Sequence, residues 1–157
     1  MDSNINSALP NISVIVPVKN EAKRITACIE GILSQTVPVE EIIIIDSGST
    51  DGTQKIVTSF PKVKLIEIEP EEFNHGGTRN LGVNVAKGDY LLFTVGDARP
   101  VSNEWIQGLL DGFTDEAVAG VCGSQIVAHE KDTNPVEWFR PQSQPVITAH
   151  QFASADE

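Results

Sequence analysis

The chain alternates short β-branched apolar runs with stretches whose apolar residues recur every three or four positions. The runs predict strands at 12–16, 42–45, 63–68, 90–95 and 118–126. The stretches between them predict helices at about 20–35, 50–60, 78–86 and 102–113. This order predicts an α/β fold with a mostly parallel central sheet, helices on both faces and right-handed crossovers.

Two of the predicted strands lead into a carboxylate. The isoleucine run at 42–45 is apolar on both faces, which is typical of a central parallel strand, and Asp46 follows it directly. The run at 90–95 is interpreted as a second buried strand, with Asp97 two positions beyond it. Because open α/β sheets bind their ligands at the carboxyl ends of the strands, both carboxylates are candidate site residues.

Polar clusters follow three of the predicted strands. They are Lys19-Asn20-Glu21, Asp46-Ser47 and Asp97-Ala98-Arg99. Parallel strands place their carboxyl ends at one edge of a sheet, so we expect these clusters to converge on one crevice. The sequence leaves other interpretations open, since Asp46 also suits a turn and Asp97 also suits a cap before Pro100.

Another candidate is His75-Gly-Gly-Thr-Arg79, which places a basic side chain in the first turn of a predicted helix behind two glycines. Glycines let a backbone approach a ligand closely, and arginine can hold a phosphate or a nucleobase carbonyl. A loop with a solvated arginine is an equal alternative. His75, His129 and His150 lack the spacing of zinc ligands. Walker and GxGxxG loops are both missing, which disfavours ATPases and dehydrogenases.

Composition narrows the expected partners. The formal net charge of −11 argues against nucleic acid, because phosphate backbones require clustered lysine and arginine. An anionic ligand would need local positive charge from a metal, single basic side chains or helix N-termini. Cys28 and Cys122 lie in apolar surroundings, and we expect buried structural thiols rather than a disulfide or a metal pair.

The length of 157 residues fits one domain, which we expect at 11–130. Residues 1–10 are polar and predict a flexible N-terminus, whereas prolines and the lack of periodicity predict an irregular tail at 131–157. No apolar run approaches the roughly 20 residues that span a bilayer. Since the N-terminus also lacks the features of a secretory signal, we expect a cytoplasmic protein without a transmembrane segment.

Several segments together resemble family 2 glycosyltransferases, which have the GT-A fold. They are Ile12-Ser-Val-Ile-Val-Pro-Val-Lys-Asn-Glu21, Ile42-Ile-Ile-Ile-Asp-Ser-Gly-Ser-Thr-Asp-Gly52, Thr78-Arg-Asn-Leu-Gly82 and the strand leading to Asp97. The resemblance runs in order from residue 12 to about residue 113. The segment Phe73-Asn-His-Gly-Gly-Thr-Arg-Asn80 is most similar to the bacterial rhamnosyltransferase-like branch of the family.

The resemblance implies a Rossmann-like GT-A nucleotide-sugar-binding fold that is incomplete at its C-terminus, with 131–157 as the start of an acceptor half. It implies metal-assisted, inverting transfer of a sugar from a nucleoside diphosphate sugar to a saccharide or lipid-linked acceptor, in cell-surface polysaccharide biosynthesis. Asp97 matches the second Asp of the family's DxD motif and would ligate Mg²⁺ or Mn²⁺. The other donor-binding residues implied are Pro17, Val18, Glu21, Asp46, Ser47 and Arg79. Asp46 would accept a hydrogen bond from the base. Peripheral association with the inner face of the membrane is compatible with this function.

Two departures from the family pattern leave a second function open. Val95 stands where the family often has the first Asp of the motif, which leaves one protein carboxylate at the metal. No residue in 123–157 matches the general base that an inverting displacement needs to deprotonate the acceptor hydroxyl. The alternative is therefore a nucleotide-sugar-binding module without turnover. A sugar nucleotidyltransferase fits less well, because the turn after the first predicted strand is not the glycine-rich basic loop that it requires.

Overall fold

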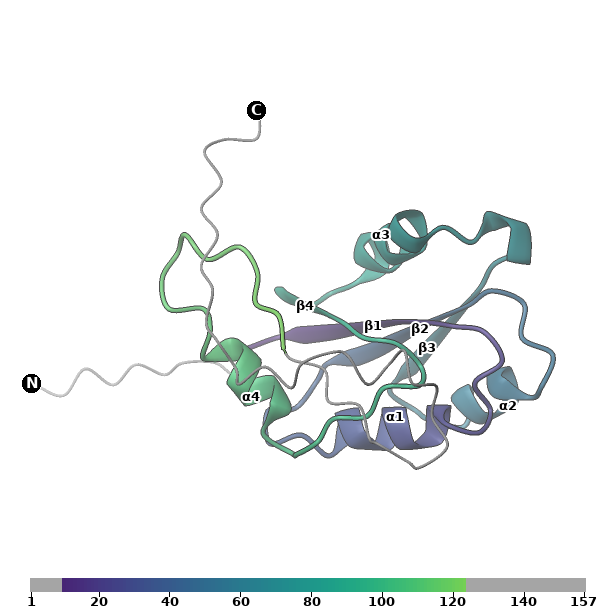
Figure 1. Cartoon of the computed structure of the whole chain (residues 1–157), viewed down its shortest axis with the longest axis horizontal. Helices are drawn as coiled ribbons and strands as arrows, with labels where there is room; N and C mark the ends of the chain where they lie inside the picture. Colours follow the sequence, from purple (N-terminus) through teal and green to yellow (C-terminus); the bar gives the residue numbers. More distant parts are fainter. Residues whose placement is uncertain (1–9, 124–157) are drawn as a thin grey trace, which may run out of the picture.

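The computed structural model describes residues 10–123 of the chain (Figure 1). The strands are β1 (Ile12–Val18), β2 (Glu41–Asp46), β3 (Val63–Glu67) and β4 (Tyr90–Phe93). The helices are α1 (Ile25–Leu33), α2 (Thr53–Val57), the 3-10 turn η1 (Pro70–Glu72), α3 (His75–Val85) and α4 (Trp105–Leu110). Strands and helices alternate along the chain, as the sequence pattern predicts.

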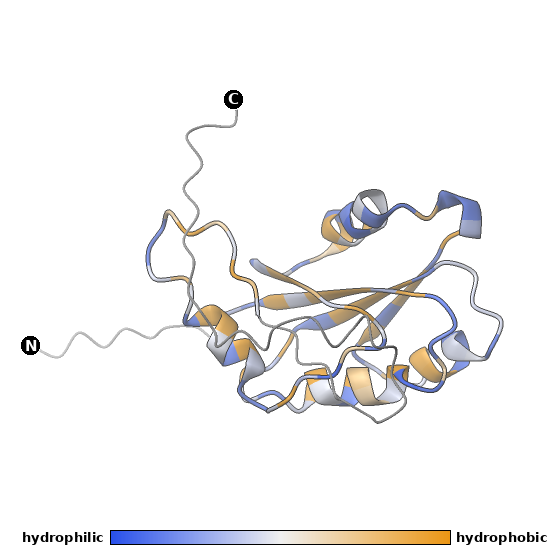
Figure 2. Ribbon diagram, in the orientation of Figure 1, coloured by the Kyte–Doolittle hydropathy of each residue, from blue (hydrophilic) through white to orange (hydrophobic). Residues whose placement is uncertain are grey.

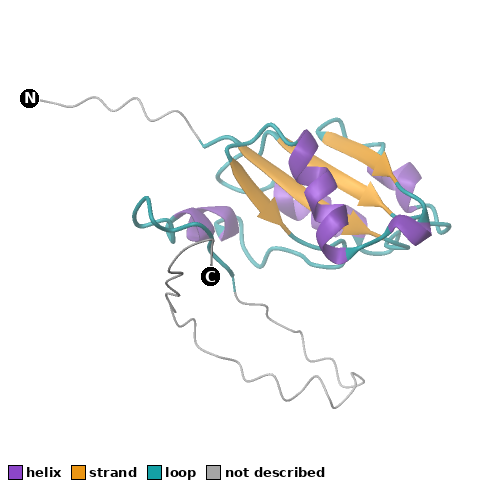
Figure 3. Ribbon diagram, turned by 90° about the horizontal axis from the view of Figure 1, so that it is seen from above, coloured by secondary structure: helices purple, strands orange, loops and turns teal. Residues whose placement is uncertain are grey.

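The strands form one parallel sheet in the order β3-β2-β1-β4. The register places Val18 of β1 opposite Asp46 of β2, and Asp46 opposite Glu67 of β3. Because all the strands run in the same direction, their carboxyl ends lie at one edge of the sheet (Figure 3). The predicted parallel sheet is confirmed.

Helices cover both faces of the sheet, because successive side chains of a strand point to opposite faces. On one face Val14 of β1 is buried in a cluster with Ile29 of α1. On the other face Ile15 is buried in a separate cluster with Leu81 of α3. Figure 1 shows α3 on one side and α1, α2 and α4 on the other, and Figure 2 shows the apolar strands between them.

A glycine brings α3 close to the sheet. A Cβ at Gly82 would lie 2.6 Å from Ile15 Cγ2 and 3.2 Å from Ile45 Cδ1. Since side-chain carbons do not approach each other at the first of these distances, position 82 accepts no larger side chain without a shift of the helix. This contact therefore fixes the distance between α3 and the central strands.

The helix after β1 begins later than the pattern predicts, at Ile25 rather than at residue 20. Asn20 has a left-handed backbone with φ of 57°. The carbonyl of Glu21 then accepts the N–H groups of Arg24 and Ile25, at 2.9 and 2.8 Å. Residues 20–24 thus form a turn that leads away from the carboxyl end of β1.

The helix after β3 begins earlier than predicted, at His75 rather than at residue 78. The side chain of Asn74 caps it by accepting the N–H groups of Gly76 and Gly77, at 3.1 and 3.0 Å. An asparagine cap stabilises a helix start by about 1 kcal/mol, which offsets the low helix propensity of the glycines. The glycine pair therefore lies in the first turn of α3 and not in a loop.

The prediction that the run at 90–95 is a buried strand is wrong. Among the described strands β4 lies at the edge of the sheet and pairs with β1 alone. Tyr90, Leu91 and Phe93 are 39%, 37% and 45% exposed, and the strand ends at Phe93. The run is apolar enough for a core strand, but no second strand of the described part covers its outer side.

The predicted strand at 118–126 is absent over its described portion, 118–123. The chain turns at Asp115, whose carboxylate accepts the N–H of Ala117 at 2.8 Å and whose carbonyl accepts that of Val118 at 3.2 Å. The remainder of that prediction, the tail at 131–157 and all of the N-terminal segment except Pro10 lie outside the described residues.

The two cysteines differ in their environments. Cys28 is buried, as expected, whereas Cys122 is exposed, so the expectation of a second buried thiol is wrong. Both are free thiols. Within residues 10–123 no helix is both long enough and apolar enough to cross a membrane.

Candidate functional site

A cavity of about 320 Å³ opens at the carboxyl edge of the sheet. Its walls come from the end of β1, the loop after β2, the segment from η1 into α3, and the residues after β4. The predicted site residues that line it are Pro17, Val18, Glu21, Ser47, Arg79 and Asp97. Clusters distant in sequence thus meet around one crevice, as expected from parallel strands.

Asp46 is the predicted site residue that does not line the cavity. It is fully buried beside Ser47, which does line it. Its Oδ1 accepts the N–H of Gly48 at 3.0 Å, the N–H of Ser49 at 2.7 Å and the amide of Gln54 at 3.0 Å. Its Oδ2 is buried and has no hydrogen-bond partner among residues 10–123. One half of the carboxylate therefore holds the turn, which agrees with the turn interpretation, while the other half is a buried acceptor that no group in the described part satisfies.

Glu21 and the segment after β4 lie in contact. A Cβ at Gly96 would approach Glu21 Cγ to 3.0 Å and Val18 Cγ1 to 2.9 Å. Glu21 Oε2 is buried without a hydrogen bond from residues 10–123, and it forms an ion pair with Arg24 Nη1 at 3.6 Å. The glycine therefore lets the chain that carries Asp97 pack directly on Glu21.

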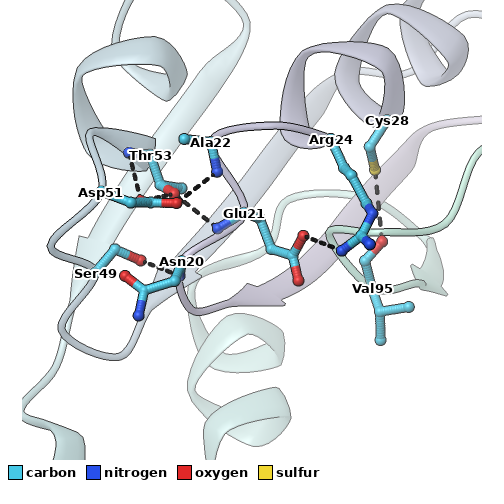
Figure 4. A network of polar contacts seen from close by, with 9 residues as sticks. All are labelled: Asn20, Glu21, Ala22, Arg24, Cys28, Ser49, Asp51, Thr53 and Val95. Carbon is cyan, nitrogen blue, oxygen red and sulfur yellow. Dashed lines mark hydrogen bonds and ion pairs between the residues drawn. The ribbon is translucent and has the colours of Figure 1, made fainter.

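The thiol of Cys28 lies beneath this contact. It donates a hydrogen bond to the carbonyl of Val95, with an Sγ to O distance of 3.6 Å (Figure 4). Burial, together with smaller contributions from the negative charges of Asp97 and Glu21, raises the pKa of the thiol to about 11. Cys28 thus remains protonated and supports the chain just before Asp97.

The loops after β1 and β2 are tied together by hydrogen bonds (Figure 4). The N–H of Asn20 donates to Ser49 Oγ at 2.8 Å, and Asn20 Oδ1 accepts the N–H of Thr50 at 2.8 Å. These two bonds hold Asn20 in its left-handed conformation. They also fix the direction in which the chain leaves β1 toward Glu21.

Asp51 forms the second tie. Its Oδ2 accepts the N–H of Ala22 at 2.9 Å, and its Oδ1 accepts the N–H and the hydroxyl of Thr53 at 3.0 and 2.6 Å. The N–H of Glu21 in turn donates to Thr53 Oγ1 at 2.9 Å. The hydrogen bond from the Thr53 hydroxyl, followed by that from Ala22, lowers the pKa of Asp51. The backbone of Glu21 is therefore held by the loop that follows Asp46.

The start of α3 supplies the opposite wall. Arg79 Nη1 donates to the carbonyl of His75 at 2.7 Å, so the guanidinium folds back over the first turn of the helix. The rings of Phe73 and His75 meet edge to face, with centroids 5.1 Å apart. Both residues line the cavity together with Arg79.

Several lining residues were missed as site residues from the sequence. They are Pro70, Phe73 and Gly96, whereas Lys19 and His75 belong to clusters that the sequence analysis names and Val95 is the first position of the DxD motif. Phe73 follows β3 by a few residues, so the rule that pointed to Asp46 would also have indicated it. The irregular appearance of residues 70–77 concealed this relationship.

Within residues 10–123 no three His, Cys, Asp or Glu side chains are grouped as a complete metal site. Magnesium is often held by one or two carboxylates, with phosphate and water oxygens as the other ligands. Asp97, which lines the cavity together with Glu21, fits such a partial site. The residues present therefore suit a divalent cation that shares its ligands with a phosphate-bearing molecule.

Comparison with known proteins gives matches over most of the chain. The family described as Glycosyl transferase family 2 matches residues 13–149. O-antigen chain rhamnosyltransferase RfbN of Salmonella typhimurium is 34% identical over 126 residues, which cover 80% of this chain and 40% of that protein. O-antigen chain rhamnosyltransferase WbaN of Salmonella anatum is 37% identical over 130 residues, which cover 82% of this chain and 40% of that protein. The chain thus spans about two fifths of the length of these relatives.

Solved structures agree with the fold. The mannosyltransferase PcManGT of Pyrobaculum calidifontis, in complex with GDP-Man and Mn²⁺, has a TM-score of 0.63 and 28% identity, covering 71% of this chain and 34% of that protein. S. aureus TarS 1–349 in complex with UDP-GlcNAc has a TM-score of 0.55 and 28% identity, and the match covers 66% of this chain and 31% of that protein. The sequence relatives and the structural neighbours agree with the resemblance found in the motifs.

Proposed function

This chain belongs to glycosyl transferase family 2, and we propose that its cavity binds a nucleoside diphosphate sugar. We propose further that the whole protein transfers the sugar, with inversion, to a saccharide or lipid-linked acceptor. Two relatives that are O-antigen chain rhamnosyltransferases by name support a role in the synthesis of a cell-surface polysaccharide. Such a role would place the protein in the cytoplasm, at the inner face of the membrane.

The unpaired Oδ2 of Asp46 carries this proposal. A buried acceptor without a donor costs about 1–3 kcal/mol, and a ligand N–H would remove that cost. Uracil, thymine and guanine each present an N–H group that can donate to a carboxylate. Asp46 itself is buried and does not line the cavity; its neighbour Ser47 does, at the end formed by the loops after β2 and β3. We therefore assign the nucleobase to this end.

The diphosphate belongs at the other end, beside Asp97. Among the described lining residues the basic side chains are Lys19, just after β1, and Arg79, in the wall that follows β3, and in a chain with a net charge of −11 they would offset part of the charge of the ligand. Mg²⁺ or Mn²⁺, held by Asp97 and the diphosphate, would stabilise negative charge on the leaving group. The neighbour solved with GDP-Man and Mn²⁺ supports this assignment.

Binding of a nucleotide sugar without turnover is the second candidate function. The carboxylates that line the cavity within residues 10–123 are Glu21 and Asp97, and both lie on the side assigned to the diphosphate. An inverting transfer also needs a base that takes the proton of the acceptor hydroxyl. No such base is recognised in the sequence of residues 123–157, and this segment lies outside the described residues except for Gly123.

Calorimetric titration of the 157-residue chain with UDP, dTDP and GDP, with and without Mn²⁺, tests the donor site. We expect binding that depends on Mn²⁺ and weakens by about tenfold or more in Asp97→Ala, which corresponds to ~1.4 kcal/mol. Asp89→Ala is the matched control, because Asp89 precedes β4 and lies outside the cavity. Metal-independent binding that Asp97→Ala leaves unchanged would contradict the assignment of Asp97.

Release of nucleotide from a nucleotide sugar separates the two candidate functions. If the chain binds the donor and also turns it over as fast as a full-length relative does, the binding-only function is excluded. If the chain binds the donor but releases no nucleotide with acceptor present, this part of the protein supplies binding alone.

A further inference from the structure

We propose that Phe73 is the residue on which the base of the bound nucleotide stacks, with His75 holding the phenyl ring in place. The inference rests on the proposed donor function and adds the residue that recognises the planar ring system. The resemblance to the family implied no donor-binding role for Phe73 or His75. The proposed stacking role requires a nucleoside diphosphate as the ligand, and it requires that Phe73 contact the base rather than the sugar.

Packing in the two apolar clusters of the described residues does not account for the position of Phe73. The ring is 38% exposed on the wall of the cavity. It belongs to neither of the two apolar clusters that the described residues form. A large apolar side chain in a concave, partly polar site is a common means of binding a flat organic ligand.

The backbone on both sides of Phe73 is held. On one side its own N–H donates to the carbonyl of Pro70 at 3.4 Å. On the other side the N–H of Asn74 donates to Thr78 Oγ1 at 3.2 Å, while the N–H of Thr78 donates to the carbonyl of Asn74 at 2.8 Å. Since the segment is already ordered, a ligand that packs on the ring loses little affinity to ordering it.

His75 restricts the ring itself. The two rings lie at 76° to each other with centroids 5.1 Å apart, an edge-to-face arrangement that is favourable for aromatic pairs. His75 is in turn fixed as the first residue of α3 and accepts the bond from Arg79 through its carbonyl. Phe73 is therefore presented to the cavity in a defined orientation.

The order of the strands places this ring at the base end of the cavity. Pro70, Phe73 and His75 follow β3, and Ser47 follows β2, on one side of β1; the segment with Asp97 follows β4, on the other side. Pro70 also lies against Gly48, since a Cβ there would be 2.7 Å from Pro70 Cγ. The aromatic wall thus shares an end with the free acceptor of Asp46, opposite the carboxylate assigned to the diphosphate.

A second aromatic pair provides a matched control. The rings of Tyr90 and Phe113 also meet at 76°, with centroids 5.4 Å apart, and Tyr90 is 39% exposed. Neither residue lines the cavity. Tyr90→Ala therefore removes an equivalent ring from an equivalent contact without touching the site.

The test is calorimetric titration, in the presence of Mn²⁺, of UDP, dTDP and pyrophosphate into the wild-type chain, Phe73→Ala, Phe73→Tyr and Tyr90→Ala. We expect Phe73→Ala to weaken UDP and dTDP by about fivefold or more, which corresponds to ~1 kcal/mol of base stacking. Phe73→Tyr should retain the wild-type affinity, and Tyr90→Ala should leave it unchanged. Pyrophosphate, which has no base, should bind all four proteins equally.

Three results would overturn the inference. They are unchanged nucleotide affinity in Phe73→Ala, an equal loss for nucleotide and pyrophosphate, and a loss for UDP-sugars that is absent for UDP. Circular dichroism checks that the variants fold, and Phe73→Leu, which keeps an apolar side chain but no aromatic ring, replaces Phe73→Ala if that variant does not. If the wild-type chain binds no nucleotide at all, the proposed donor function itself fails and this inference fails with it.

Discussion

Gly96 and Glu21 are in contact across the cavity floor, and a Cβ on Gly96 would lie 3.0 Å from Glu21 Cγ. The contact joins the segment after β4 to the segment after β1. It also explains why a glycine immediately precedes Asp97. A side chain at position 96 would separate two carboxylates that we assign to the same ligand.

Gly96→Ala should therefore weaken Mn²⁺-dependent nucleotide binding, because the added methyl group pushes Asp97 away from Glu21. We expect a loss of affinity of about tenfold, which corresponds to ~1.4 kcal/mol. Gly108→Ala is the control, since a Cβ there meets nothing within 4 Å. It should leave the affinity unchanged; equal affinities for wild type and Gly96→Ala would refute the role of the contact.

Gly82→Ala should destabilise the fold. The new Cβ would lie 2.6 Å from Ile15 Cγ2, and the overpacking cost of about 1–3 kcal/mol exceeds the gain of roughly 1 kcal/mol from replacing a helical glycine. Gly77→Ala, in the same helix, should stabilise it, because its Cβ would lie an ordinary 3.6 Å from Asn74. Urea unfolding of both variants measures the difference, and opposite signs are the expected result.

Asp51 should make part of the stability sensitive to acid. Its pKa is lowered in the folded state by the bonds from Thr53 and Ala22. The stabilisation is therefore complete above the unfolded-state pKa of about 3.9 and is lost as the pH falls through the lower folded-state value. Melting temperatures of wild type and Asp51→Asn at about pH 7 and about pH 3 test this. On acidification the melting temperature of the wild type should fall by more than that of the variant. An identical fall in both proteins would show that Asp51 contributes nothing to the acid sensitivity.

The two thiols should differ in reactivity. Cys28 is buried and its pKa is raised to about 11, so little of the reactive thiolate is present near neutral pH. Cys122 is exposed. A chromogenic disulfide reagent should modify one thiol of the native chain quickly and the second only after unfolding in urea. Cys122→Ser should abolish the fast reaction, and rapid modification of both thiols would contradict the buried position of Cys28.

Strand ends were the part of the site that the sequence revealed best. Asp97 lines the cavity and Asp46 directly precedes Ser47, which lines it, because a parallel sheet places such residues at one edge; that rule needs no knowledge of side-chain packing. The burial of β4 was predicted wrongly because burial, unlike the position of a strand end, does depend on how other parts of the chain pack. Whether Tyr90 or Phe93 is covered depends on which chain lies on the outer side of the strand, and local apolar character carries no information on that.

The start of α3 was missed because two signals conflict there. A His-Gly-Gly run has low helix propensity, and the residues were therefore assigned to a loop. Asn74 overrides this by capping both glycine N–H groups. With the helix start misplaced, His75 and Phe73 had no defined relation to Arg79, and an aromatic wall could not be inferred.

The walls of the cavity are built by connections that follow different strands, so one wall can change in sequence without the other. Residues 70–79 lie in one connection and residues 95–97 in another, and the two meet only across the ligand space. If the proposed donor site is right, an exchange of the first connection would alter the wall assigned to the nucleobase and leave the segment that carries Asp97 unchanged. The preferred donor could then change without any change in the sheet.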